Sequence, residues 1–548
     1  MSERGMNNGK ERRLNRTFTA AVIAALIVPA GARAQQETPE LTLEEYRIVG
    51  RDTRVFSITG ERSSTVFFTP LALTIPEEQR SVRESRGLIS NDERTNRRTV
   101  FSVTRGPDID IEYTGGAMKT NDLYAKTGWA GESGGGTVGF THWSGEANTP
   151  ENLAPTAQDI DAAFYRHTYF GDLTIGAGYT SQSGDAPSST LRPDNRELTR
   201  FRGEAALATG LGSRWSARGR ARFTGGTYTN LVTENENDET SVAGGGNITG
   251  AMLGGAVTLR VDTDYYSLED ASGSSLTAGG TCSWLIGKAI GFTAGALVST
   301  FAMPSEDTEV RVYPQAALDI RMTPRFYLRA SYEPRLVTHT FGDIYDANGM
   351  VTLATPLLYE DRSSAVAGEI GFGLPADLSV SAGWSRSVSD NMPVYTRTTM
   401  AGGGEFYDIV PGAEVTLSTV SVAGSYHPGG SLEVDGEFRS QEASWNLSGD
   451  VPFIPDMEGT VTGSYRLGNV WKCVARGHFY GEHFVETDST DTEDSFFVID
   501  LGVERSLFRG STTLSLDLRN LTDQDGAWWS GNYRIPGFGL YFGIRTHY

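Results

Sequence analysis

The chain has 548 residues, a formal net charge of −21 at pH 7 and a mean hydropathy of −0.31. The acidic balance excludes a nucleic-acid-binding role, because binding to phosphates requires a basic surface. Beyond residue 40 no run of about eighteen apolar residues occurs, which excludes a helical membrane protein. The 65 glycines, 22 tyrosines and 25 phenylalanines are typical of a membrane β-barrel, in which only every second strand residue meets lipid.

The N-terminus is predicted to be a signal peptide. An arginine-containing stretch precedes a short apolar core, Phe18–Ala30, and Ala32-Arg33-Ala34 then matches the small-residue pattern of a cleavage site. The core is too short to cross a membrane stably, so residues 1–34 are predicted to be removed and the mature chain to begin at Gln35.

Residues 35–107 are predicted to form a periplasmic segment that precedes the first strand. Its part Arg80–Arg98 is strongly charged with both signs, which favours a solvated or disordered segment. The same part could equally fold back into the interior of the structure that follows.

From Asp108 onward the chain is predicted to form strands, because short segments alternate between apolar and polar residues. In Trp215–Phe223 aromatic and small residues occupy the odd positions and arginines occupy most of the even ones. Segments of this kind reach about ten residues, the length that a tilted strand needs to cross a bilayer, whereas soluble sheets average about five or six.

The predicted connections alternate between short and long, as in outer-membrane barrels with short periplasmic turns and long extracellular loops. Short turns are predicted at 211–213, 253–255, 322–325, 374–377, 427–430 and 508–510. Long polar loops are predicted at 181–195, 230–240, 341–361, 389–404, 485–495 and 522–535.

The predicted fold class is therefore all-β, a transmembrane antiparallel β-barrel that occupies residues 108–548. Counting gives about 22 strands, an even number, with both termini in the periplasm. A porin-like count of about 16 to 18 would require several of the alternating segments to be loops. Cys282 and Cys473 are predicted to face lipid on strands about nine apart, too distant for a disulfide.

The interior face of the predicted barrel carries charges of both signs. Cross-strand ion pairing is the favoured interpretation because acids are interleaved with the arginines, and the alternative is a wetted path that attracts anionic solutes. The best candidate for a locally basic wall consists of Arg200, Arg202, Arg214, Arg218, Arg220 and Arg222.

No enzymatic function is predicted, since the sequence contains no phosphate loop, nucleophile elbow or cysteine cluster. The acidic loops 233–239 and 486–494 match no calcium-binding pattern and are interpreted as solvated outer loops. The nearest histidine pair, His478 and His483, is expected on opposite faces of one strand, which forbids shared metal binding. The sequence predicts no catalytic residue, cofactor or metal.

The final strand places apolar side chains at every second position and an aromatic residue at the terminus. Barrel-assembly machinery reads terminal strands of this kind, so we expect this machinery as a partner beside the outer-membrane lipid. The residues of this assembly signal are Phe538, Leu540, Phe542, Ile544 and Tyr548.

The last hundred residues resemble the closing hairpins of TonB-dependent receptors. The Asn520-Leu521-Thr522-Asp523 step, where the family has a similar Asn-Leu-acid element, is the most specific part. The elements that carry the resemblance, in family order, are 449–455, 465–466, 479–482, 497–502, 517–523 and 535–538.

The resemblance implies a receptor barrel, but the family's N-terminal plug domain is not recognisable in residues 35–107. This segment would be a linker or a reduced plug. It contains an acidic-then-apolar stretch similar to the one that these receptors offer to TonB, and an ordinary linker is the alternative. The predicted TonB-contact residues are Glu44, Glu45, Tyr46, Arg47, Ile48 and Val49.

The expected function is therefore uptake of a small-molecule or oligomeric solute across the cell outer membrane. Because even barrels of about 16 to 18 strands leave an aqueous channel, a barrel of this size should be blocked by residues 35–107, by inward-folded loops such as Phe341–Asp361, or by a partner. The alternatives are a passive porin-like channel and a structural barrel that anchors a partner complex.

Overall fold

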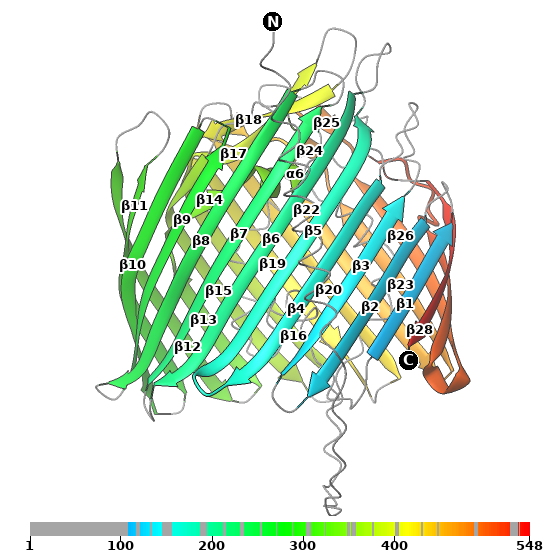
Figure 1. The fold of residues 1–548 in the computed structure, drawn as a ribbon, viewed down its shortest axis with the longest axis horizontal. Helices are drawn as coiled ribbons and strands as arrows, with labels where there is room; N and C mark the ends of the chain where they lie inside the picture. Colours follow the sequence, from blue (N-terminus) through cyan, green and yellow to red (C-terminus); the bar gives the residue numbers. More distant parts are fainter. Residues whose placement is uncertain are drawn as a thin grey trace, which may run out of the picture. The chain divides into compact units, whose positions relative to one another are not determined.

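The computed structural model describes one large sheet closed on itself and two small two-stranded sheets (Figure 1). The signal peptide 1–34, the segment 35–107 and Tyr548 lie outside the described residues. The described residues run from Asp108 to His547 apart from 117–120, 132–133, 145–155, 187–193, 212–214, 231–234, 253–254, 270, 288, 303–307, 324, 348–350, 352–357, 375–377, 400–404, 429–430, 447–448, 469, 487–490, 527–534 and 536.

All strands of this sheet pair antiparallel with their neighbours. The first half contains β1 (Asp108–Gly116), β2 (Asn121–Gly131), β3 (Gly134–Ser144), β4 (Thr156–Thr168), β5 (Gly171–Ala186), β6 (Asp194–Leu211), β7 (Trp215–Asn230), β8 (Asn235–Met252), β9 (Gly255–Leu268), β10 (Ala271–Ile286), β11 (Ile290–Ala302) and β12 (Glu309–Thr323). The second half contains β13 (Phe326–Tyr332), β14 (Arg335–His339), β15 (Leu358–Leu374), β16 (Leu378–Asp390), β19 (Val415–Tyr426), β20 (Leu432–Trp445), β21 (Gly449–Asp450), β22 (Met457–Leu467), β23 (Trp471–Tyr480), β26 (Phe496–Leu507), β27 (Thr512–Arg519) and β28 (Gly539–His547).

These 24 strand segments form 22 spans of the wall, because two spans are interrupted. β13 and β14 both pair with β15, and β21 and β22 both pair with β20. β1 pairs with β28, which closes the ring. The predicted fold class and strand number are confirmed.

Apolar side chains cover the outside of the barrel and polar side chains line its lumen. In β9, Leu259, Val261 and Tyr265 are each about half exposed to the outside, and the alternate positions Arg260 and Asp262 face the lumen. On β28, Phe538 just before the strand, Leu540, Phe542 and Ile544 are exposed in the same way. This is the alternation that a barrel requires when lipid surrounds it and water fills it.

The two cysteines are free and lie where they were expected. Cys282 is on β10 and Cys473 is on β23, nine spans further around the wall. A disulfide between them would need Cα atoms within about 7 Å, so their predicted separation is confirmed.

Described strands end on either side of the predicted short turns, and the turn 508–510 is a single turn of 3₁₀ helix, η3 (Phe508–Gly510), between β26 and β27. Several predicted long loops are wrong in extent. The 230–240 loop is mostly strand, because β7 and β8 stay paired up to Asn230 and Asn235, and β5 likewise extends to Ala186. Strands that continue beyond the lipid need no apolar side chain, so their polar ends look like loops in the sequence.

Three predicted loops at the long-loop end of the barrel contain secondary structure of their own. The loop 341–361 contains helix α6 (Phe341–Ala347), which follows β14 directly. The loop 389–404 contains β17 (Met392–Thr399), which pairs with β18 (Glu405–Gly412). The loop 485–495 contains β25 (Thr492–Glu493), the partner of β24 (His483–Phe484). In the described part of the chain, no helix is long and apolar enough to span a membrane.

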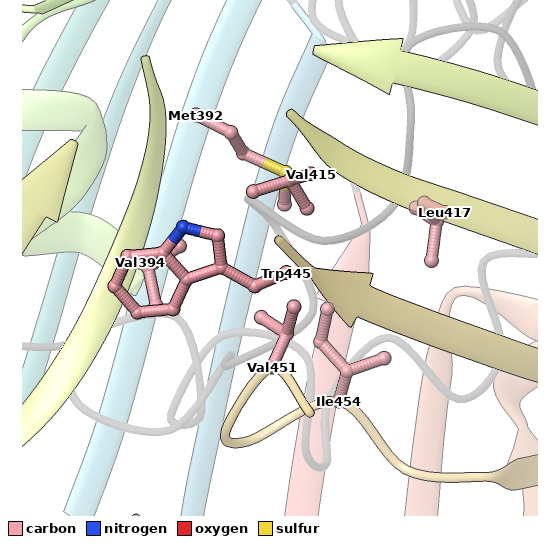
Figure 2. Packing of buried hydrophobic residues seen from close by; sticks show 7 residues of the cluster. All are labelled: Met392, Val394, Val415, Leu417, Trp445, Val451 and Ile454. Carbon is pink, nitrogen blue, oxygen red and sulfur yellow. The ribbon is translucent and has the colours of Figure 1, made fainter. Parts of the chain in front are cut away.

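The β17–β18 hairpin packs on the long-loop ends of β19 and β20. Trp445 of β20 lies in the middle of an apolar cluster that also draws on the segment after β21 (Figure 2). Burial of such side chains contributes about 1.5–3 kcal/mol each, which fixes the hairpin against the wall. The buried members are Met392, Val394, Val415, Leu417, Trp445, Val451 and Ile454.

Candidate functional site

The predicted basic wall lies on two adjacent strands and faces the lumen. Arg200 and Arg202 are on β6, and Arg218, Arg220 and Arg222 are on β7, while Arg214 lies outside the described residues. The intervening odd positions face outward, as the exposure of the Phe201 and Phe223 side chains shows.

The three arginines of β7 are exposed to the lumen, and Arg222 lies in register with Glu204 and Ala243. Arg218 pairs in register with Ala208 and Asn247, and Arg220 pairs with Ala206 and Gly245. The one ion pair that they make in the described residues joins Arg220 Nη2 to Asp262 Oδ1 at 3.8 Å.

Lumen arginines on other strands are bound closely by carboxylates. Arg329 Nε lies 2.8 Å and Arg321 Nε 3.1 Å from the carboxylate of Asp319. Between β20 and β22, Arg439 Nε lies 2.8 Å from Glu458 Oε2. Cross-strand ion pairing therefore describes these parts of the wall, and β7 differs from them.

Arg200, higher on the same wall, is buried in a different environment beneath α6. Glu239 of β8 accepts hydrogen bonds from the Tyr228 hydroxyl at 2.7 Å and from the Gly342 N–H at 3.1 Å, and is only 2% exposed. A Cβ at Gly342 would lie 2.8 Å from the Tyr228 hydroxyl and 3.3 Å from Arg200 Nη1, so only glycine fits without displacement.

We call Thr340 and α6 together the arm. It follows β14, which stays paired with β15 in the wall, and it contacts the lumen faces of β7, β8 and β9. The Phe341 N–H donates to the Tyr266 hydroxyl at 2.7 Å, and the Phe341 ring packs edge-on against Tyr228 at 4.5 Å between centroids. Thr340 caps α6, since its hydroxyl oxygen accepts the Asp343 N–H at 3.1 Å.

The base of the arm is held by a buried polar cluster on β14, β15 and β16. Glu360 contacts His339 Nε2 at 2.8 Å, Ser389 Oγ at 2.6 Å and Arg362 Nη2 at 3.0 Å. Its neighbour Asp361 accepts a hydrogen bond from the Tyr313 hydroxyl at 2.8 Å. The carboxylate lies between the histidine and the serine, so the cluster lacks the order of a hydrolytic triad.

The β17–β18 hairpin supports the arm from the other side. The Tyr395 hydroxyl donates to the Ile344 carbonyl at 3.5 Å, and burial raises the pKa of Tyr395 well above its ordinary value. Arg397 of the same hairpin is bound by Glu486, with Nε at 3.0 Å, and by Asp491. The acidic loop 486–494 was interpreted as solvated, but these two acids form ion pairs with the hairpin.

The expected placement of the histidine pair on one strand is wrong. β23 ends at Tyr480, and His483 begins the separate hairpin β24–β25. Within the described ranges, no three His, Cys, Asp or Glu residues are grouped to hold a metal ion.

Inward folding of the loop Phe341–Asp361 was one of the predicted ways of blocking the barrel, but the sequence did not predict the residues that hold the arm. Glu239 was assigned to a solvated acidic loop, and Gly342 to a long polar loop. The available signal was two tyrosines, Tyr228 and Tyr266, at lumen-facing positions close to the ends of their strands.

Comparison with known proteins shows the fold. No protein-family model and no curated protein matches the chain. Solved structures do match, among them the siderophore receptor PiuA from Acinetobacter baumannii, at 11% identity over 81% of this chain and 82% of that one, with a TM-score of 0.62. The FrpB iron transporter from Neisseria meningitidis matches at 9% identity over 83% and 82%, with a TM-score of 0.65. The pyoverdine outer membrane receptor FpvA from Pseudomonas aeruginosa matches at 10% identity over 81% and 79%, with a TM-score of 0.64.

The fold is thus a 22-strand antiparallel barrel similar to the barrels of these outer-membrane proteins. The similar structures include TonB-dependent receptors, the family that the closing segment of the sequence resembles.

Proposed function

We propose that the protein lies in the cell outer membrane and takes up a solute through a gated barrel, as a receptor and not as an enzyme. The observation that carries this proposal is the arm, which is folded into the lumen and bound to the far wall through Glu239 and Phe341. The similar solved structures carry titles of receptors and transporters for siderophores, iron and copper, which supports uptake.

The arm favours gated uptake over a passive pore. A barrel of 22 spans is wider than the porins of about 16 to 18 strands that already leave an aqueous channel. Side chains at the tip of the arm are fully buried, with Phe341 and Ile344 each 1% exposed. Opening this end of the barrel would require these contacts to break, which is what ligand-driven gating needs.

Conductance in planar bilayers tests the proposal. We expect the intact protein to be closed and the variant Gly342→Val to conduct, because a larger side chain cannot fit between Tyr228 and Glu239. The matched control is Gly203→Val, since a Cβ at Gly203 meets nothing within 4 Å. An intact protein with a large open conductance would make it a passive channel.

A deletion of residues 35–107 completes this experiment. Conductance that appears only in the deletion would assign closure to that segment and not to the arm. A barrel that stays closed in every variant would favour the anchoring role.

We further propose that the stretch Glu44–Val49, outside the described residues, binds TonB and couples uptake to energy. A pull-down with the periplasmic domain of TonB tests this, with Ile48→Pro and Val49→Pro as variants that should abolish binding. Absence of binding by the unaltered protein would rule out energy coupling through this segment.

We also propose that barrel-assembly machinery recognises the final strand. Its outward row Phe538, Leu540, Phe542 and Ile544 is exposed along one face, and Tyr548 lies beyond the described residues. Replacement of Phe542 by Ser should reduce the amount of assembled barrel in outer-membrane fractions, and an unchanged amount would contradict this role.

A further inference from the structure

We propose that Arg218, Arg220 and Arg222 form a lumenal anion site for solutes that carry two or more carboxylate or phosphate groups. The inference rests on the proposed function, which it deepens by naming the class of solute. Its starting point is that β7 is the part of the described wall where consecutive lumen-facing positions are all arginine.

The spacing of the three side chains suits an extended anion. Alternate residues of a strand lie about 6.6 Å apart on one face, so the three arginines are spread over about 13 Å along the strand. A guanidinium group binds a carboxylate or a phosphate through two parallel hydrogen bonds. A solute with several anionic groups can therefore contact more than one arginine at a time.

The neighbours leave these arginines accessible. The positions flanking Arg220 in the sheet are Ala206 and Gly245, which carry no side chain long enough to cover a guanidinium group. The side chain of Arg220 is 70% exposed as a result.

The neighbouring acids neutralise the site incompletely. Asp262 leans across Gly245, where a Cβ would collide with its Oδ1, and it contacts both Arg260 and Arg220. Glu204 lies opposite Arg222 in the register, and Asp264 interacts electrostatically with Arg220 and Arg222. The acids therefore reduce the positive charge of the line most at Arg222 and least at Arg218, whose register partners Ala208 and Asn247 are uncharged.

The site lies on the path that a solute would take after passing the arm. Arg222 precedes Tyr228, which lies under the arm, by six residues on the same face, about 20 Å along the strand. The three arginines therefore follow the gate on the way to the short-turn end. A low-dielectric wall with one sign of charge concentrates counter-ions near it, so anionic solutes would be enriched there.

Binding of inorganic tripolyphosphate to the full-length protein in detergent, measured by calorimetry, tests the proposal. The test variant is Arg218→Gln with Arg222→Gln. The matched control is Arg321→Gln with Arg329→Gln, which removes the same charge from lumen arginines that Asp319 already binds. Each protein is measured with and without Gly342→Val, so that a closed arm cannot hide the site.

We expect the test variant to bind at least about tenfold more weakly and the control to change by less than about threefold. Binding should also weaken steeply with salt, because the site is exposed to water. Equal weakening in both double variants would show that only total lumen charge matters and would overturn the site. The proposal would also be overturned if tripolyphosphate bound neither the unaltered protein nor the protein that carries Gly342→Val alone.

This experiment is independent of the test of gated uptake. If Gly342→Val conducts but tripolyphosphate does not bind, the proposed anion site is refuted and gated uptake still stands. If tripolyphosphate binds but no variant conducts, gated uptake is refuted and the proposed anion site still stands.

Discussion

The two ends of the β6–β7 wall use the same face of the same strands in opposite ways. Near the long-loop end, Arg200 and Tyr228 are buried beneath the arm, and the acid beside them, Glu239, is fully enclosed. Further down, Arg218 lies between the uncharged residues Ala208 and Asn247 and is exposed to the lumen. The difference shows that neighbours, and not the arginine itself, decide whether a lumen charge seals the barrel or remains available to a solute.

The largest expected effect comes from removing the aromatic anchor of the sealed end. Phe341→Ala deletes a buried ring packed on Tyr228 and should destabilise the closed arm by about 3–5 kcal/mol. Limited proteolysis within 340–357 measures this as faster cleavage. The control is Phe170→Ala, which removes an exposed ring in the β4–β5 turn, and equal cleavage of both variants would contradict a buried anchor.

A smaller effect is expected from the acid that holds the arm. Glu239→Gln weakens two hydrogen bonds to a buried carboxylate, which should cost the closed state about 1–3 kcal/mol. Hydrogen exchange at the Gly342 amide measures it directly. The matched control is Glu204→Gln on the exposed part of the wall, where we expect exchange at Gly342 to stay unchanged.

On the exposed part of the wall, loss of an arginine should barely affect folding. Arg222→Gln is expected to change the free energy of unfolding by less than about 0.5 kcal/mol, because the arginine side chain is exposed to the lumen. Arg329→Gln loses an ion pair at 2.8 Å and should cost up to about 1 kcal/mol. Denaturant unfolding in detergent compares the two, and a larger loss for Arg222→Gln would mean that its charge has a structural partner.

The last prediction concerns alkaline pH and should have no effect at neutrality. Because burial raises the pKa of Tyr395, the folded hairpin keeps the phenol proton at a pH where the unfolded chain releases it. Stability from this group is therefore fully present below its ordinary value of 10.0 and is lost as the pH rises beyond it. Proteolysis of the β17–β18 hairpin against pH measures this, and Tyr395→Phe should remove the dependence.

The wall could be predicted from the sequence because each strand carries its own pattern. The alternation in Trp215–Phe223 and the lipid-facing positions of Cys282 and Cys473 follow from local residues and the period of a strand. The sealed end could not be predicted in this way. The contact between Glu239 and Gly342 joins residues 103 positions apart, and the polar strand ends beyond the lipid lack the apolar signal.

The pairing of β1 with β28 has a consequence for how the chain must be made. The ring joins Ile111 to Thr546, so no closed wall exists until the last nine-residue strand, Gly539–His547, has been exported. Until then β1 and β27 are two open edges, each a row of unpaired N–H and C=O groups that can pair with other chains. Loss of the final strand would thus remove closure itself, and a cell would receive an aggregating sheet in place of a slightly smaller pore.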